Sequence, residues 1–298
     1  MPKHIPGEPD IVVLNLPGAG GLRGLQSLVR AEADGLHIGY AHPRHINQAL
    51  LYDDVEGFSL DDVKPVGVPS DTASTYTYFI HESEATSLDE FLATGETYNM
   101  GQTEPVGPGY PNNAIWQALD APLNVIYGYG GTAEIAAGLD RGELEVGYRI
   151  PSTMHLYPEW VETGEWKPIF HNGAEPSVDP LVVEYLEMTG QANADIPHLY
   201  EAFDVDEEMQ EYMDLGLEMF LSFSRTVVIP TDTPDDITTV IRDAFEATVA
   251  DPEFVQAAEV AGHQVGYGAW EDLEALITHA RELFADPQRL EEFLALAD

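Results

Sequence analysis

The chain has 298 residues, and its 12 Lys and Arg against 53 Asp and Glu give a formal net charge of −41 with His neutral. Nucleic acids and anionic membranes are bound mainly through Lys and Arg, so this balance excludes an unaided partner of either kind. The hydrophobic content of 44% is too high for a disordered acidic protein, and the length is enough for two domains with their own cores.

The acidic residues are spread along the whole chain, and lysine occurs only at Lys3, Lys64 and Lys167. At high ionic strength the repulsion between surplus carboxylates is screened, whereas in dilute buffer it opposes the compact state. We therefore expect a salt-adapted surface and a halophilic source.

The N-terminus MPKHIPGEPD lacks the basic and apolar regions of a secretory signal, and no apolar run approaches the 18 residues of a membrane span. Cysteine is absent, which excludes disulfides, a thiolate nucleophile and a lipid-anchor Cys in the chain as written. Taken alone, these features predict a cytoplasmic chain that does not insert into a membrane.

The first hundred residues alternate short apolar runs with helical patterns. Residues 10–14 resemble a strand, a glycine turn follows at 15–21, and apolar residues recur at helical spacing from Leu22 onward. Ser87 and Glu90 form a capping box that predicts a helix there. Further strands are expected at residues 36–40, 63–68 and 76–80.

The remaining residues repeat this alternation. Thr233 is expected to cap a long helix that starts at Pro234 and ends at Val249. Strands are expected at 98–100, 124–127, 144–148 and 226–229, and further helices at 113–119, 133–139, from 252, at 270–284 and at 290–296. Strands alternating with helices predict an α/β fold with a mostly parallel sheet.

Common catalytic signatures are missing, among them the phosphate loop, the Gly-x-Ser-x-Gly elbow and His-Glu-x-x-His. The turn at Gly18 fails the dinucleotide fingerprint because Arg23 stands where the pattern needs glycine or alanine. His42 and His45 lie three residues apart, but Pro43 between them indicates a loop, and surface histidines are favoured over a metal site. We expect no enzymatic activity, no cofactor and no metal.

Three glycine-rich turns lead into expected helices, at residues 18–21, 107–113 and 128–132. A helix N-terminus presents free N–H groups and a partial positive charge, so converging turns of this kind could hold a carboxylate. Each turn by itself can equally be a tight strand-to-helix connection. Arg149 follows the strand expected at 144–148, where it could grip a carboxylate or form a salt bridge with one of the many acids.

The stretch IVVLNLPGAGGLRGLQSLVRAEADGLHIGY (11–40) resembles the substrate-binding proteins of tripartite tricarboxylate transporters, the Bug family. The resemblance continues through INQALL (46–51), GPGYPNNAIWQAL (107–119), YGYGGTAEIAAGLDRGELEVGY (127–148) and TPDDITTVIRDAFEATVADPEFVQAAEVAGHQV (233–265). It implies a type II periplasmic-binding-protein fold, with two α/β lobes and a ligand cleft between them. The lobes would comprise residues 1–102 with 224–298, and residues 103–223.

The resemblance further implies an extracytoplasmic receptor that binds a small carboxylate and delivers it to the permease subunits of the transporter. The positions that match the family's ligand loops, together with nearby His42 and the candidate cation, are His42, Gly107, Gly109, Tyr110, Asn112, Gly130, Gly131, Thr132 and Arg149. Tyr110 and Asn112 replace serines of the family, which suggests an altered ligand.

Two features depart from the family pattern. The family's first strand, with its Pro-Gly-Gly loop, has no counterpart before residue 11, and Arg149 stands close to where the family tends to carry Asp. Either the start of the sequence is misassigned or the protein is truncated, and in the second case the alternative function is a truncated cytoplasmic carboxylate sensor or protein-interaction module on the same fold.

Overall fold

The chain is divided into two compact units. A computed structural model describes residues 1–52, 55–69, 77–102, 119, 121–130, 132–149, 163–172, 183, 187–188, 190, 196–222, 225–261 and 265–295. Described residues of 1–72 and 215–297 form unit 1, and those of 73–214 form unit 2. Residues 77–102, expected in the first lobe, pack with unit 2, so the units differ there from the boundaries expected from the sequence.

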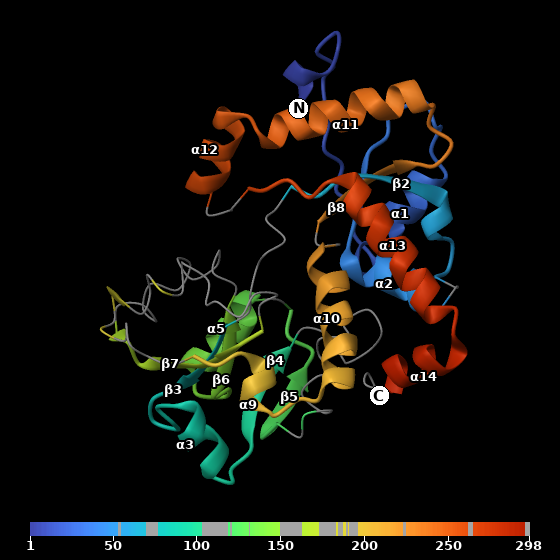
Figure 1. The fold of residues 1–298 in the computed structure, drawn as a ribbon. Coiled ribbons are helices and arrows are strands. Elements are labelled where there is room, and N and C mark those ends of the chain that lie inside the picture. The colour runs from blue at the N-terminus through green and yellow to red at the C-terminus, as the bar shows by residue number, and fades with distance from the viewer. Residues whose placement is uncertain are drawn as a thin grey trace. The chain divides into compact units, whose positions relative to one another are not determined.

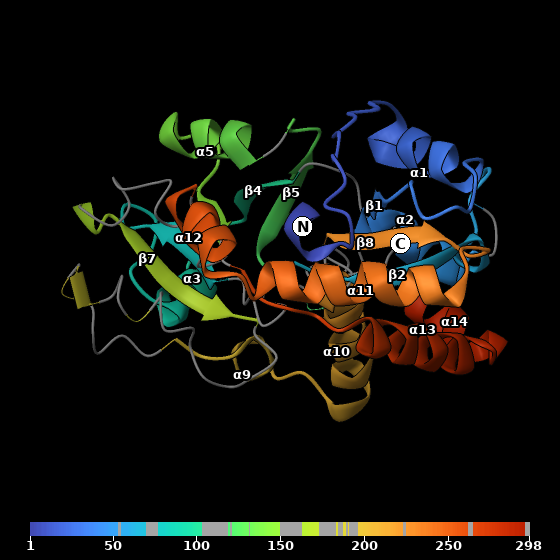
Figure 2. The same ribbon diagram turned by 90° about the horizontal axis from the view of Figure 1, so that it is seen from above.

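Unit 1 contains a sheet with the strand order β1-β8-β2. Its strands are β1 (Gly39–Ala41), β8 (Thr226–Pro230) and β2 (Val63–Gly67). Its helices are η1 (Pro2–His4), η2 (Ala19–Gly21), α1 (Leu22–Val29), α2 (Pro43–Leu51), η3 (Leu60–Asp62), α11 (Asp235–Val249), α12 (Pro252–Val260), α13 (Trp270–Phe284) and α14 (Pro287–Ala295). Helices α11 and α13 both pack against β2 (Figures 1 and 2).

Helix α11 buries one apolar stripe against this sheet. Ile241, Phe245 and Val249 recur every four residues and pack with Val66 of β2 and Ile229 of β8. This is the spacing that places side chains on one helix face. The expected cap is wrong, because Pro234 is the N-cap residue and no side chain caps the helix.

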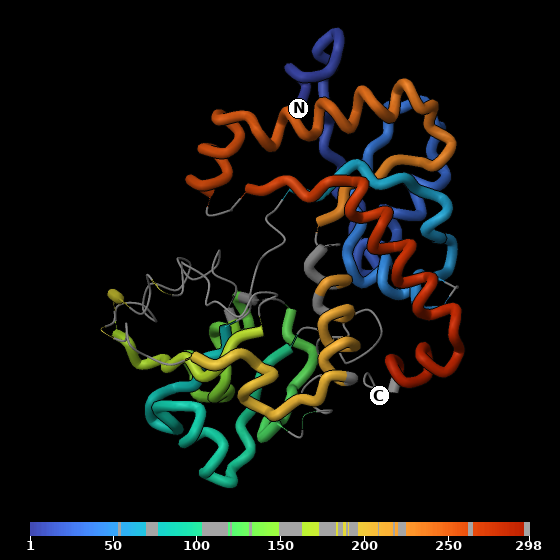
Figure 3. The backbone as a smooth tube through the Cα atoms, in the orientation of Figure 1, coloured from blue at the N-terminus to red at the C-terminus, as the bar shows by residue number. Residues whose placement is uncertain are grey.

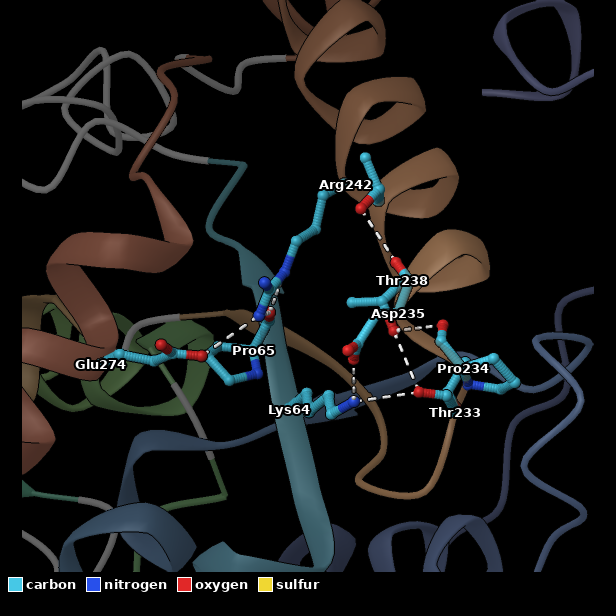
Figure 4. A network of polar contacts seen from close by, with 9 residues as sticks. Lys64, Pro65, Thr233, Pro234, Asp235, Thr238, Arg242 and Glu274 are labelled. Atoms are coloured by element: carbon cyan, nitrogen blue, oxygen red, sulfur yellow. Dashed lines mark hydrogen bonds and ion pairs between the residues drawn. The ribbon is translucent and has the colours of Figure 1, made fainter.

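A network of hydrogen bonds and ion pairs connects α11 to β2 (Figure 4). The Arg242 guanidinium donates to the Pro65 carbonyl from Nε at 2.9 Å and from Nη2 at 2.7 Å, and it lies 3.4 Å from the centroid of the Trp270 ring. Nη2 also lies 3.2 Å from a Glu274 carboxylate oxygen. Arg242 therefore provides hydrogen-bond donors to the Pro65 carbonyl. The register of the β2–β8 pair shifts between Pro65 and Gly67, directly beside this carbonyl.

The N-terminus is held on unit 1, where η1 contacts α11 (Figure 3). Lys3 Nζ donates to Glu253 at 2.7 Å, and His4 Nε2 lies 2.9 Å from the carboxylate of Asp251. Asp251 also accepts the Glu253 N–H and so caps α12, as the Asp-Pro pair predicts.

Unit 2 contains a mixed sheet with the order β5-β4-β6-β3-β7. Its strands are β3 (Thr77–His81), β4 (Tyr98–Gln102), β5 (Leu123–Tyr127), β6 (Val146–Arg149) and β7 (Trp166–His171). Its helices are α3 (Leu88–Ala93), α5 (Thr132–Asp140) and α9 (Leu199–Ala202), with the first part of α10 (Glu207–Ser222). The core includes the stacked rings of Tyr78 and Phe170, whose centroids lie 4.7 Å apart.

The expectation of mostly parallel sheets is wrong. In the described strands only the pairs β4–β5 and β4–β6 are parallel, and the pairs formed by β8 and β3 are antiparallel. Strand β8 follows the whole of unit 2 in sequence and inserts between two earlier strands. A local alternation of strand and helix does not specify the direction of a strand that returns from so far away.

The strand expected at residues 10–14 is also absent from the structure. These residues are extended chain, with Val12 77% and Val13 81% exposed. The sheet of unit 1 ends at β1, and no described strand pairs with them. Among the described helices, none is long and apolar enough to cross a membrane.

Candidate functional site

The glycine turn of unit 1 forms because its residues have left-handed backbone conformations. Gly18, Gly20 and Gly21 have φ angles of 131°, 61° and 100°. Residues with a Cβ rarely adopt such backbone angles, which accounts for the glycines in Pro-Gly-Ala-Gly-Gly. Gly21 is the N-cap residue of α1 and supplies no side-chain cap, and the Leu22 N–H that follows it donates to the Ala19 carbonyl of the turn.

His42 lies at the N-terminus of α2, where the sequence predicts a loop. The structure corrects this, because Pro43 occupies the first helical position, where proline is favourable. The Arg44 N–H donates to His42 Nδ1 at 3.3 Å, so His42 acts as the helix cap. Burial, together with the charges of His45 and Arg44, lowers the pKa of His42 to about 4.

His45 joins α2 to the glycine turn. Its Nε2 lies 3.0 Å from the Gly20 carbonyl oxygen, which can only accept a hydrogen bond, so Nε2 carries the proton. The side chain is 2% exposed, which makes the expectation of a surface histidine wrong for His45. Packing of α2 against the turn buries it.

Two arginines that the sequence analysis missed flank the same turn. The Arg23 side chain lies against Gly18, and Arg44 Nη1 is 3.4 Å from the position a Cβ would take on Gly20. Both occupy the first turn of a helix, where a cation opposes the helix dipole. That unfavourable placement, in a chain with so few cations, is the sequence signal by which they could have been found.

In unit 2, the ends of several strands meet at one edge of the sheet. Thr77 begins β3 and pairs with Arg149 at the end of β6 and with His171 at the end of β7. On the other side of β6 in the sheet order, Gln102 ends β4 and pairs with Tyr127 at the end of β5. The structure therefore brings the backbone of Arg149 and the turn that follows Tyr127 to the same edge.

The turn after β5 already holds a carboxylate of the chain itself. The Gly130 N–H donates to Glu134 Oε2 at 2.6 Å. Thr132 begins α5, and Gly128 has a φ of 105°. The turn is thus able to bind a carboxylate, and a ligand at Gly130 would have to displace Glu134. The predicted residues Gly107, Gly109, Tyr110, Asn112 and Gly131 lie outside the described residues.

Polar groups line the rest of this edge. The Tyr148 hydroxyl donates to Gln102 Oε1 at 2.9 Å. Thr77 is fully buried, and its hydroxyl has no hydrogen-bond partner in the part of the chain that is described. Burial and the charge of His198 lower the pKa of His171 to about 4. Buried hydroxyl and amide groups of this kind suit hydrogen bonding to a polar ligand.

Within the described residues, no group of three or more His, Asp or Glu could hold a metal ion. Each unit by itself therefore offers polar or cationic candidate groups, of the kinds that suit the binding of anions and polar ligands.

Comparison with known proteins shows the fold. No family model matches the sequence, and no curated protein matches it. A TctC solute-binding protein from Polaromonas is 16% identical, with a TM-score of 0.63 over 99% of this chain and 88% of that chain. The periplasmic binding protein BugD is 19% identical, with a TM-score of 0.58 over 94% and 84%. MatC from Rhodopseudomonas palustris, solved with bound malate, is 16% identical, with a TM-score of 0.57 over 93% and 85%.

These likenesses extend over nearly the whole chain. The protein has the α/β fold of the periplasmic solute-binding proteins. Within that class, the fold is the one shared by the TctC and BugD proteins. The fold expected from the sequence motifs is confirmed.

Proposed function

We propose that this protein is a non-enzymatic solute receptor that binds a small organic carboxylate outside the cytoplasm and delivers it to a membrane permease. The observation that carries the proposal is the match to a TctC solute-binding protein over 99% of the chain. The malate held by MatC supports a carboxylate as the ligand.

The local geometry supports the same ligand class. The Gly130 N–H binds a carboxylate oxygen of Glu134, and the glycine turn before α1 leaves helix N–H groups without a side-chain cap. Backbone N–H groups at helix starts bind anions without needing many cationic side chains. This suits a protein with 53 acidic residues.

The proposal is tested by thermal unfolding of the full chain in molar KCl, with malate, citrate and adipate added in turn. A receptor saturated at about 100 times its dissociation constant gains about 2.7 kcal/mol, which raises the melting temperature by several degrees. Malamide is the matched control, because it keeps the carbon skeleton of malate and removes its charges. Ionic strength is held constant throughout.

Stabilisation by one or more acids, without stabilisation by malamide or sugars, supports the receptor. If sugars or neutral amides stabilise the chain and no carboxylate does, the proposed ligand class is wrong.

A further inference from the structure

We propose that two copies of this chain associate through unit 1 by exchanging strands, so that residues 11–14 of each copy pair with the open edge of β1 in the other. The partner of this surface is thus a second copy of the same chain. The inference is independent of the proposed receptor function.

Residues 11–14 form an extended segment that lacks a pairing partner. Their sequence, Ile-Val-Val-Leu, is rich in the β-branched residues that favour strands. The four side chains are between 46% and 81% exposed, and no backbone hydrogen bond joins these residues to any described part of the chain. An extended apolar segment with unpaired N–H and C=O groups can add to the edge of a sheet.

Strand β1 has an edge of this kind. It is the outermost strand in the order β1-β8-β2, and no described strand lies on its other side. One face of β1 is covered, because Leu28 of α1 lies 2.6 Å from the position that a Cβ would take on Gly39. On the opposite face of β1 and of the residues that lead into it, Leu36, Ile38 and Tyr40 recur every two residues and are exposed. This strand therefore presents both an unpaired edge and an exposed apolar face.

The distribution of charge favours this surface for contact between copies. Residues 11–52 contain three arginines and only two acids, a net charge of +1, whereas the rest of the chain carries −42. Contact between two copies through strongly acidic surfaces would bring carboxylates against carboxylates, which is unfavourable. Contact through residues 11–41 instead brings nearly neutral, apolar surface against the same surface. Two copies can therefore approach each other here without that repulsion.

The surface is also complementary to itself. In a dimer with a two-fold axis the same patch of both subunits meets, so each subunit must supply both halves of the contact. Unit 1 meets this requirement, because the extended segment and the open edge both lie within residues 11–41. Reciprocal exchange pairs both of them, whereas a partner that supplied one strand or one edge would leave the other half unpaired.

The contact is small, and its size sets its strength. Strand β1 spans three residues, so each of the two pairings joins only three or four residues. Such a contact falls short of the about 1,200–2,000 Å² that stable interfaces bury. Because interfaces of that full size begin at micromolar dissociation constants, we expect a dissociation constant above about 1 μM here. In dilute solution the chain is then monomeric, and residues 11–14 are exposed.

Sedimentation of the full chain in 2 M KCl over a series of protein concentrations tests the association. The mean mass should rise from the 32.7 kDa of one copy toward twice that value. Association should weaken in 0.1 M KCl, where the repulsion between copies reaches about 10 Å. Val12→Pro combined with Val13→Pro removes two consecutive N–H groups, one of which faces the partner strand in either orientation. We expect this double variant to associate at least about tenfold more weakly.

Val13→Lys and Val260→Lys are a matched pair of substitutions. The two valines are 81% and 85% exposed, and only Val13 lies on the proposed surface. Val13→Lys should weaken association at least about tenfold, and Val260→Lys by less than about twofold. A wild-type chain that stays monomeric up to about 1 mM in 2 M KCl overturns the proposal. Association of the proline and Val13→Lys variants as strong as that of wild type overturns it as well.

Cross-linking distinguishes exchange between copies from pairing within one chain. The chain contains no cysteine, so each introduced cysteine is unique. A mixture of Val13→Cys copies and Ile38→Cys copies, treated with a short bismaleimide, should give a covalent dimer, and a mixture of Val260→Cys and Ile38→Cys copies should not. If a chain with both Val13→Cys and Ile38→Cys cross-links only within itself, residues 11–14 pair with their own β1 and the exchange is wrong.

Discussion

His42 shows how one residue combines a structural role with a titratable group. Its Nδ1 accepts the Arg44 N–H at the start of α2, so the cap needs an unprotonated Nδ1. Burial and the nearby charges of His45 and Arg44 lower its pKa to about 4, and Tyr40 packs edge-on against it with ring centroids 6.5 Å apart. The folded chain therefore holds His42 neutral.

We predict that His42→Asn reduces the loss of stability on acidification. The unfolded histidine titrates near pH 6.5 and the folded one near 4, so between these values the unfolded chain binds more protons. The contribution of His42 is complete above pH 6.5 and is lost as the pH falls toward 4. Asparagine can still cap the helix but does not titrate.

The measurement compares urea unfolding of His42→Asn and wild type from pH 7.5 to 4.5 in constant salt. As the pH falls, the free energy of unfolding should decrease more for wild type than for His42→Asn. His42→Ala also removes the cap and should be less stable than His42→Asn at every pH. A constant difference between wild type and His42→Asn across the range would contradict the prediction.

At the scale of elements, local patterns predicted most of the described strands and helices, and they failed at residues 10–14 and at helix α2. The Ser87 cap of α3 is confirmed, because Ser87 Oγ accepts the Glu90 N–H, but the Glu90 carboxylate accepts the Thr86 N–H, so the expected reciprocal capping box is not formed. The valine-rich residues 10–14 form no strand, since a strand needs a partner and the described sheet provides none for them. Apolar patterning indicates which residues could be buried, but pairing decides which ones are.

We predict that two isosteric substitutions differ in their effect on the free energy of unfolding. Val66→Thr, in β2, should lower the free energy of unfolding by about 1–3 kcal/mol, because it buries a hydroxyl at a fully buried position. Val13→Thr should change it by less than about 0.5 kcal/mol, because this side chain is 81% exposed. Urea unfolding in molar KCl measures both. Equal destabilisation would mean that residues 10–14 are buried in solution.

The whole molecule is dominated by its net charge of −41. The described cations form few ion pairs, and several of these involve exposed side chains, such as Arg281 with Asp61 and Arg141 with Glu143. Exposed pairs contribute little to stability and cannot offset the repulsion among so many carboxylates. Salt must therefore act on the compact state as a whole.

We predict that the melting temperature rises steadily between 0.1 M and 2 M KCl. Screening shortens the range of the repulsion from about 10 Å at 0.1 M to about 3 Å at 1 M, so most of the increase should come below 1 M. Calorimetry across this series is the measurement, with sucrose at equal osmolarity as the control for exclusion of solutes from the protein surface. A melting temperature that is independent of KCl would contradict the expected salt-adapted surface.

The sequence by itself determined the class of fold, because glycine turns, caps and helical spacing are local properties that survive in any arrangement of the elements. It also predicted that glycine turns such as Gly18–Gly21 could hold an anion. The tertiary structure decided strand directions, the exposure of residues 10–14 and the meeting of Arg23, Arg44 and His45 at one turn. These features depend on contacts between segments distant along the chain, and neither periodicity nor charge pattern specifies which segments come together.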